Sequence, residues 1–181
     1  EFTLSRKDPA YVGRAKEVRA AQEAVEAEKN PIEALEELAP VIDAIHTKYA
    51  EITNENIGIG STIFAVKPGD GSAREQAASC QKVLGGWANI ANEYATKRYR
   101  SNLINWGMLP FLIEKGDLPF TNGDYIFLPD VRKAVEEKAS EFEAYVVKDG
   151  SLVPFVLKMG ELTDDEREII LKGCLINYNR Q

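Results

Sequence analysis

The sequence predicts one α/β domain in which strand–helix–strand units come first and an antiparallel hairpin follows. From Gly58 onward, short apolar runs separated by Gly, Pro and Asp alternate with short helical patterns, which is typical of βαβ units. Asp149-Gly150, between two apolar runs, is a strong signal for a hairpin turn. A chain of 181 residues can bury about 70% of its unfolded surface, and no repeat or low-complexity linker divides it. We therefore expect a single domain over residues 1–181.

The N-terminal segment is expected to be mainly helical over residues 9–50. The dipeptides Asp8-Pro9 and Asn30-Pro31 each combine an N-cap residue with proline at the first helical position. Apolar residues after the second pair recur at three- and four-residue steps, which predicts one buried face. Pro40 should kink or split that second helix. The predicted face consists of Ile32, Leu35, Leu38, Ile42, Ile45 and Tyr49.

The remainder of the sequence predicts alternating strands and helices. Parallel βαβ units need helical cover, and the hairpin at Asp149-Gly150 joins the last two strands. Thr163 and Glu166 have the spacing of a capping box and open a final helix. The expected strands lie near residues 62–66, 87–91, 108–113, 125–128, 142–147 and 152–158. The expected helices lie near residues 73–83, 96–106 and 129–138.

Charge and cysteine content exclude several classes of protein. A net charge of −7 argues against broad phosphate-driven binding of nucleic acid, which needs a basic face. The apolar runs are far shorter than the roughly 20 residues that cross a bilayer, so no membrane partner is expected. Cys80 and Cys174 form neither a CxxC pair nor a zinc spacing, which favours unpaired thiols in a reducing, cytoplasmic compartment and no metal site.

The most informative segment is the glycine-rich turn at residues 68–71, which leads from an apolar strand into a helix beginning around Ser72-Ala73. Glycines there let the backbone approach a ligand closely, and a helix N-terminus presents free N–H groups to an anion. Ser72 offers a hydroxyl, and Arg74 can bind a carboxylate through two parallel hydrogen bonds. The residues therefore predict a carboxylate site.

A structural interpretation of the same turn stays open, because many helices begin with a glycine-rich turn and a serine N-cap. Neither a P-loop nor a Rossmann glycine pattern is present, which argues against nucleotide binding. The single histidine, His46, lies on the apolar helical face, which favours a core or boundary position over a catalytic base.

Three ordered motifs resemble the swivel domain of the aconitase family. They are GDGSAREQAAS, then VLGG, then YRSNLINWGMLPF, and the two chain ends are also similar to that family. The resemblance implies a swivelling three-layer β/β/α domain, with a mainly parallel central sheet, helices on one side and a small antiparallel sheet on the other. The helical segment matches less well, which suggests a possible insertion within residues 9–50.

The resemblance implies an aconitase-like hydratase, a lyase that removes and re-adds water on a hydroxy-polycarboxylate. Ser72 stands where the family has its catalytic base, and Arg74 where it has a carboxylate-binding arginine. Gly71 and Ala73 are the other expected substrate-binding positions. Ala73 replaces the second serine of the motif and Gln76 the usual histidine, so the substrate itself stays open.

The resemblance also implies partners. The family's [4Fe–4S] cluster is held by three cysteines in other domains, and neither Cys80 nor Cys174 matches their positions. We therefore expect a C-terminal fragment that binds no cofactor, is inactive alone, and works with cluster-bearing N-terminal domains or a large subunit. The substrate is expected to be a small polycarboxylate.

Two other functions remain open from the sequence. The changes at Ala73 and Gln76 are those expected of an active site that has lost its catalytic function, which would make the chain a non-catalytic anion-binding or regulatory module. Some aconitases bind RNA, and Lys97, Arg98 and Arg100 form a basic cluster. The net charge of −7 opposes this second alternative, so no nucleic-acid partner is expected.

Overall fold

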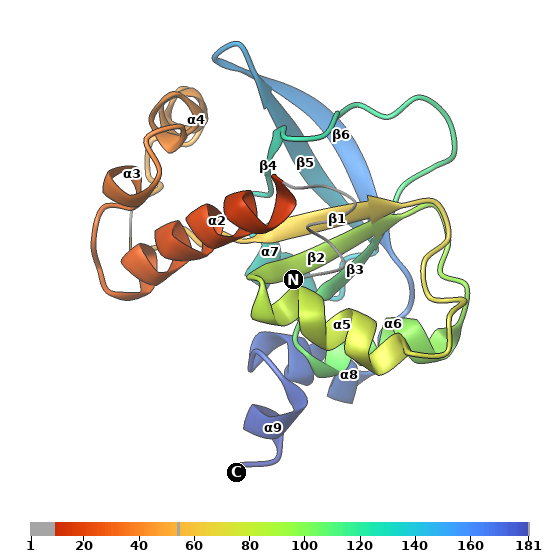
Figure 1. Cartoon of the computed structure of the whole chain (residues 1–181). Helices are drawn as coiled ribbons and strands as arrows, with labels where there is room; N and C mark the ends of the chain where they lie inside the picture. Colours follow the sequence, from red (N-terminus) through yellow and green to blue (C-terminus); the bar gives the residue numbers. More distant parts are fainter. Residues whose placement is uncertain (1–9, 54, 181) are drawn as a thin grey trace.

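The computed structural model describes residues 10–53 and 55–180, whose strands form one six-stranded sheet in the order β1-β2-β3-β6-β5-β4 (Figure 1). Every expected strand is confirmed, with each end within one residue of its predicted position. This agreement follows from the apolar runs, which local turn residues bound on both sides. The strands are β1 (Ser61–Ala65), β2 (Gly86–Ala91), β3 (Leu109–Leu112), β4 (Tyr125–Phe127), β5 (Glu141–Lys148) and β6 (Ser151–Met159).

The sheet is mixed, which corrects the expectation of a mainly parallel central sheet with a separate antiparallel one. β1, β2 and β3 pair in parallel, whereas β6, β5 and β4 continue the same sheet with antiparallel pairings. The junction is short, with Phe111 opposite Met159 and Leu112 opposite Lys158. β6 lies between β3 and β5, and Lys158 near its end is opposite Leu112 on one edge and Glu141 on the other. The hairpin turn itself is confirmed, with positive φ at both Asp149 and Gly150.

Helices cover both faces of the parallel strands, which also differs from the expected cover on one side. Successive residues of a strand point to opposite faces. Accordingly, Asn89 of β2 bonds to Tyr99 on one face, while Ile90 joins Val135 in the main core on the other. Figure 1 shows α5, α6 and α8 together below the sheet. These helices are α5 (Arg74–Val83), α6 (Lys97–Asn105), α7 (Val131–Glu136), α8 (Asp164–Leu171) and α9 (Leu175–Tyr178).

The N-terminal helices stand beside the sheet and have a small core of their own, formed by Ala21, Leu35, Leu38 and Ile42. The second predicted helix is split, but at residues 35–37 and not at Pro40. Proline is tolerated in the first turn of a helix because its missing N–H would have no partner there. The predicted cap at residues 8–9 lies outside the described residues. These helices are α2 (Tyr11–Glu26), α3 (Pro31–Ala34) and α4 (Leu38–His46).

None of the helices in the described ranges combines the length and the apolar composition needed to cross a bilayer. The C-terminal helix α8 begins with the expected capping box. The Thr163 hydroxyl accepts the Glu166 N–H at 3.2 Å, and the Glu166 carboxylate accepts the Thr163 N–H at 2.8 Å.

Replacing Thr163 by alanine should lower the free energy of unfolding by about 1 kcal/mol, because one N–H of the first turn loses its acceptor. Thr163→Ser keeps the hydroxyl and is the matched control. Denaturant titration of both variants measures the difference. Equal stability of the two would show that the hydroxyl does not contribute.

Candidate functional site

The candidate site lies at the carboxyl ends of β1, β2 and β3, where three loops meet. Parallel strands end on the same edge of a sheet, and ligands of α/β proteins bind in the crevice outside that edge. Hydrogen bonds tie the loops together. Asn92 Nδ2 donates to the carbonyls of Ile113 and Glu114 at 3.1 and 3.2 Å, and the Ala95 N–H donates to Pro68 O at 2.9 Å. The segment after β2 therefore holds the turn after β1 and is itself bonded to the segment after β3.

Gly69 fixes the conformation of this turn. Its φ is +94°, and a Cβ at this position would lie only 2.4 Å from Tyr99 Cβ, so a side chain has no room. The Gly69 carbonyl accepts two hydrogen bonds, from Arg74 Nε at 3.0 Å and from the Thr96 hydroxyl at 3.2 Å. Both the glycine and its carbonyl therefore determine where the following residues lie.

Ser72 is exposed, and its hydroxyl makes no hydrogen bond with any described residue. Helix α5 begins at Arg74, one residue later than expected, and its N-cap is Ala73, which has no side-chain cap. The interpretation of Ser72 as an N-cap is therefore wrong. The hydroxyl is left available to a ligand at the same turn that carries Arg74.

The start of α5 offers donors to an anion. Within the described chain, the N–H groups of Ala73, Arg74 and Gln76 have no acceptor, as expected for the first turn of a helix. Arg74 is half-buried, and its only hydrogen bond to a described residue runs from Nε to Gly69 O, which leaves both terminal nitrogens for a carboxylate. A Cβ added to Gly71 would meet nothing within 4 Å, so the space beside the turn is open. The four predicted site residues are consecutive in the chain and lie at the start of α5.

The charges around the turn are mixed. Lys67 pairs with Glu93 at 2.9 Å, and this hydrogen-bonded pair lowers the pKa of Glu93 and raises that of Lys67. Lys97 and Arg98 at the start of α6 are exposed and form no ion pair with a described residue. The exposed carboxylate of Asp70 lies in the same turn, so cations and an anion are both present there.

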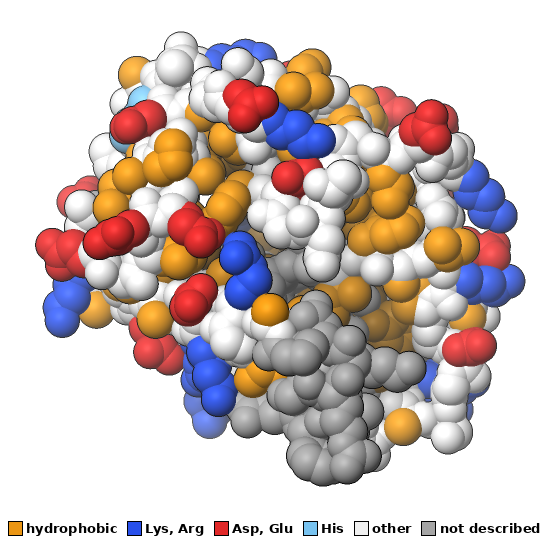
Figure 2. Space-filling view, turned by 45° about the horizontal axis from the view of Figure 1, so that its top comes forward, with side chains coloured by type: hydrophobic (Ala, Val, Ile, Leu, Met, Phe, Trp, Pro, Cys, Tyr) orange, Lys and Arg blue, Asp and Glu red, His pale blue; other side chains and the backbone are white. Residues whose placement is uncertain are grey.

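The predicted basic cluster is smaller in the structure than in the sequence. Arg100 is directed to the end of β6, where Nη2 donates to the carbonyls of Gly160 and Glu161 at 3.3 and 2.8 Å. On the visible part of the face in Figure 2, Lys and Arg side chains are scattered among Asp and Glu. Of the three predicted basic residues, Lys97 and Arg98 are exposed, whereas Arg100 is half-buried.

Sequence reasoning missed the residues of α5, β2 and α6 that support the turn. Glu75 Oε1 accepts the indole N–H of Trp106 at 2.7 Å. Tyr99 packs on Gly69, and its hydroxyl accepts from Gln81 Nε2 at 2.9 Å and Asn89 Nδ2 at 2.8 Å. These partners are far apart in the sequence, so spacing could not reveal them. From the sequence alone, a glutamate in the first turn of a helix indicates only a favourable interaction with the helix dipole.

Comparison with protein families places residues 23–116 in the family described as the aconitase C-terminal domain. The match covers just over half of the chain, starting within α2 and ending after β3, so it contains the turn and all three parallel strands. The chain belongs to the aconitase C-terminal domain family. The resemblance to the aconitase swivel domain is thereby confirmed. A search of curated proteins finds no match.

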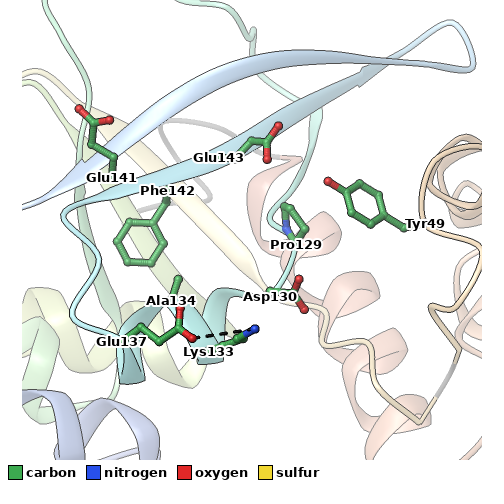
Figure 3. Close-up of a pocket in the computed structure, with 9 residues that line it drawn as sticks. All are labelled: Tyr49, Pro129, Asp130, Lys133, Ala134, Glu137, Glu141, Phe142 and Glu143. Atoms are coloured by element: carbon green, nitrogen blue, oxygen red, sulfur yellow. Dashed lines mark ion pairs between the residues drawn. The ribbon is translucent and has the colours of Figure 1, made fainter.

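A pocket elsewhere in this aconitase-type domain is poorly suited to a polycarboxylate. It has a volume of about 280 Å³ and lies between β5, α7 and Tyr49 (Figure 3). Among the described residues that line it, Lys133 is the one cation, and it lies 3.9 Å from Glu137. Like charges in one pocket repel, so an anionic ligand is disfavoured there. The acidic residues of the lining are Asp130, Glu137, Glu141 and Glu143.

The described residues of this aconitase C-terminal domain do not fit an iron–sulfur cluster. They contain no group of three or more His, Cys, Asp and Glu side chains that could hold a metal ion. Cys80, exposed on α5, and Cys174, half-buried before α9, are both free thiols. Cluster irons are held by several cysteine thiolates, so this part of the chain lacks the ligands.

Proposed function

We propose that this chain is the swivel domain of an aconitase-like hydro-lyase that dehydrates and rehydrates a hydroxy-polycarboxylate. The observation that carries the proposal is the start of α5, where the Ser72 hydroxyl, the terminal nitrogens of Arg74 two residues later and the first N–H groups of the helix have no hydrogen-bond partner among the described residues. The family supports a hydratase-type context. The roles of Ser72 as base and Arg74 as carboxylate ligand are the proposal's own.

The proposed chemistry begins with removal of a proton from the carbon next to a substrate carboxylate. Ser72, as its alkoxide, takes this proton; the electron pair of the C–H bond forms the double bond, and hydroxide leaves the neighbouring carbon. Rehydration is the reverse. No residue of this chain is assigned to the departing hydroxide.

A serine can act in this way only if its alkoxide is stabilised. The positive end of the α5 dipole, the free N–H groups and the Arg74 guanidinium all favour a negative charge at this turn. Arg74 additionally aligns the substrate, because its planar guanidinium matches a carboxylate with two parallel hydrogen bonds. Gly71 and the small side chain of Ala73 leave room for the ligand.

The proposal includes a cluster-bearing partner, either N-terminal domains or a large subunit, because the described residues provide no cluster ligands. The chain alone is then expected to bind a polycarboxylate without converting it. A non-catalytic anion-binding module would bind the same ligand, and the two functions differ only when Ser72 is tested with the partner present.

Arg74→Lys should weaken binding of tricarballylate, a non-reacting tricarboxylate, by about tenfold. Lysine keeps the charge but loses the two-pronged geometry, and one hydrogen bond between charged groups is worth roughly this factor. Isothermal titration or amide shift perturbation on the chain measures the dissociation constant. Arg98→Lys, an exposed cation on α6 without an ion pair among described residues, is the control. Equal affinities of the two variants would remove Arg74 from the site.

A further inference from the structure

We propose that Trp106 and Asn102 are positioning residues that hold the Glu75 carboxylate against α6 and away from the anion site. This inference rests on the proposed function, because it concerns the same turn. It assigns a role to three residues that contact no ligand themselves.

Glu75 is held at three points by the last turn of α6. Its Oε1 accepts the Trp106 indole N–H at 2.7 Å. The Asn102 amide, in the orientation that satisfies both groups, donates to Glu75 Oε2 at 3.2 Å and accepts the Glu75 backbone N–H at 3.2 Å. Both carboxylate oxygens are thus engaged.

The position of Glu75 makes this arrangement necessary for an anion site. Glu75 is the second residue of α5, directly after Arg74 and one turn from Ser72. A free carboxylate in the first turn of a helix is attracted to the same N–H groups and the same dipole end that would bind a substrate. It would therefore compete with the substrate and repel it.

Helix α6 controls both sides of the turn. At its start, the Thr96 hydroxyl and the Tyr99 ring hold Gly69. At its end, Asn102 and Trp106 hold Glu75. The turn that carries Ser72 and Arg74 lies between these two attachments, so α6 fixes its position and keeps the neighbouring carboxylate out of it.

The inference predicts an effect that can be reversed by a second substitution. Trp106→Phe releases one carboxylate oxygen and should weaken tricarballylate binding about tenfold, as expected when an existing like charge moves closer to a bound anion. Glu75→Gln removes the charge and should change affinity by no more than about twofold. The double variant should then return close to the wild-type affinity, because the released side chain is neutral.

Trp87→Phe is the matched control, because Trp87 is the other tryptophan of the chain and its indole N–H bonds to no described residue. Melting curves establish that each variant is folded at the temperature of titration. If Trp106→Phe and the double variant bind tricarballylate with equally low affinity, Trp106 acts through packing and the inference is overturned. Unchanged affinity of Trp106→Phe would overturn it as well.

A ligand-free measurement separates this inference from the proposed function. The amide signals of Ala73 and Arg74 should shift in Trp106→Phe and return toward their original positions in the double variant. If wild-type protein binds no tricarballylate, the proposed function fails, and these signals alone then decide whether Trp106 positions Glu75. Signals that do not respond to either substitution contradict the positioning role.

Discussion

Gly107→Ala is expected to lower the free energy of unfolding by about 3 kcal/mol or more. Alanine would have to adopt a left-handed backbone conformation that it disfavours, and its Cβ would overlap a neighbouring segment. Gly107 has a φ of +72°, and its Cβ would lie 1.8 Å from Gly173 O and 2.4 Å from Gly173 C. The obstacle is backbone, which cannot rotate away as a side chain can. The segment between α8 and α9 would have to move.

Gly107 also ends α6. Its N–H donates to Ile104 O at 2.8 Å and the Met108 N–H donates to Leu103 O at 2.9 Å, the pattern of a Schellman motif. Because Trp106 directly precedes this motif, a displaced helix end should also disturb the Glu75 contact.

Gly123→Ala separates the two contributions. Gly123 has a φ of +88°, but nothing lies within 4 Å of its Cβ position, so only the backbone term remains and a loss of about 1 kcal/mol is expected. Thermal unfolding of both variants should differ by about 4–8 °C for a domain of this size. Equal melting temperatures would show that the contact with Gly173 relaxes without cost.

The elements of the fold were predictable because their signals are local. Apolar runs bounded by turn residues gave the strands, and the Asp149-Gly150 turn and the Thr163 capping box have the expected geometry. The pairing of β6 with β3 was not predictable, because two backbone segments far apart in sequence meet through only two residue pairs. The break at residues 35–37 was missed because Pro40 is harmless in a first turn.

The candidate site was predictable to a similar degree. The turn, Ser72 and Arg74 follow from glycines, a hydroxyl and a cation in sequence order, and the structure places them at one helix start. The N-cap was misassigned by one residue, because Ala73 adopts that position without a side-chain cap. The contact between Glu75 and Trp106 depends on how two helices pack, which no spacing in the sequence reveals.

Ser72→Ala, assembled with the cluster-bearing partner, is expected to lower kcat by about 10²–10⁴-fold, the usual contribution of a general base. KM should stay within about twofold of wild type, because the lost interaction belongs to the transition state and Arg74 still binds the carboxylate. Ser79→Ala is the matched control, since Ser79 lies on the same helix and its hydroxyl donates only to Gln76 O at 3.2 Å.

A second, independent effect is expected on the stability of the same variant. Because the Ser72 hydroxyl has no partner within the described chain, its removal should change the free energy of unfolding by no more than about 0.5 kcal/mol, as for an ordinary surface substitution. A structural role would produce the opposite pair of results, lost stability and an unaltered rate. Melting curves and single-turnover rates on one preparation distinguish the two. A normal rate in Ser72→Ala would end the catalytic assignment and leave the turn as an anion-binding site, whereas a low rate with unchanged stability supports a base whose hydroxyl is held free for the substrate.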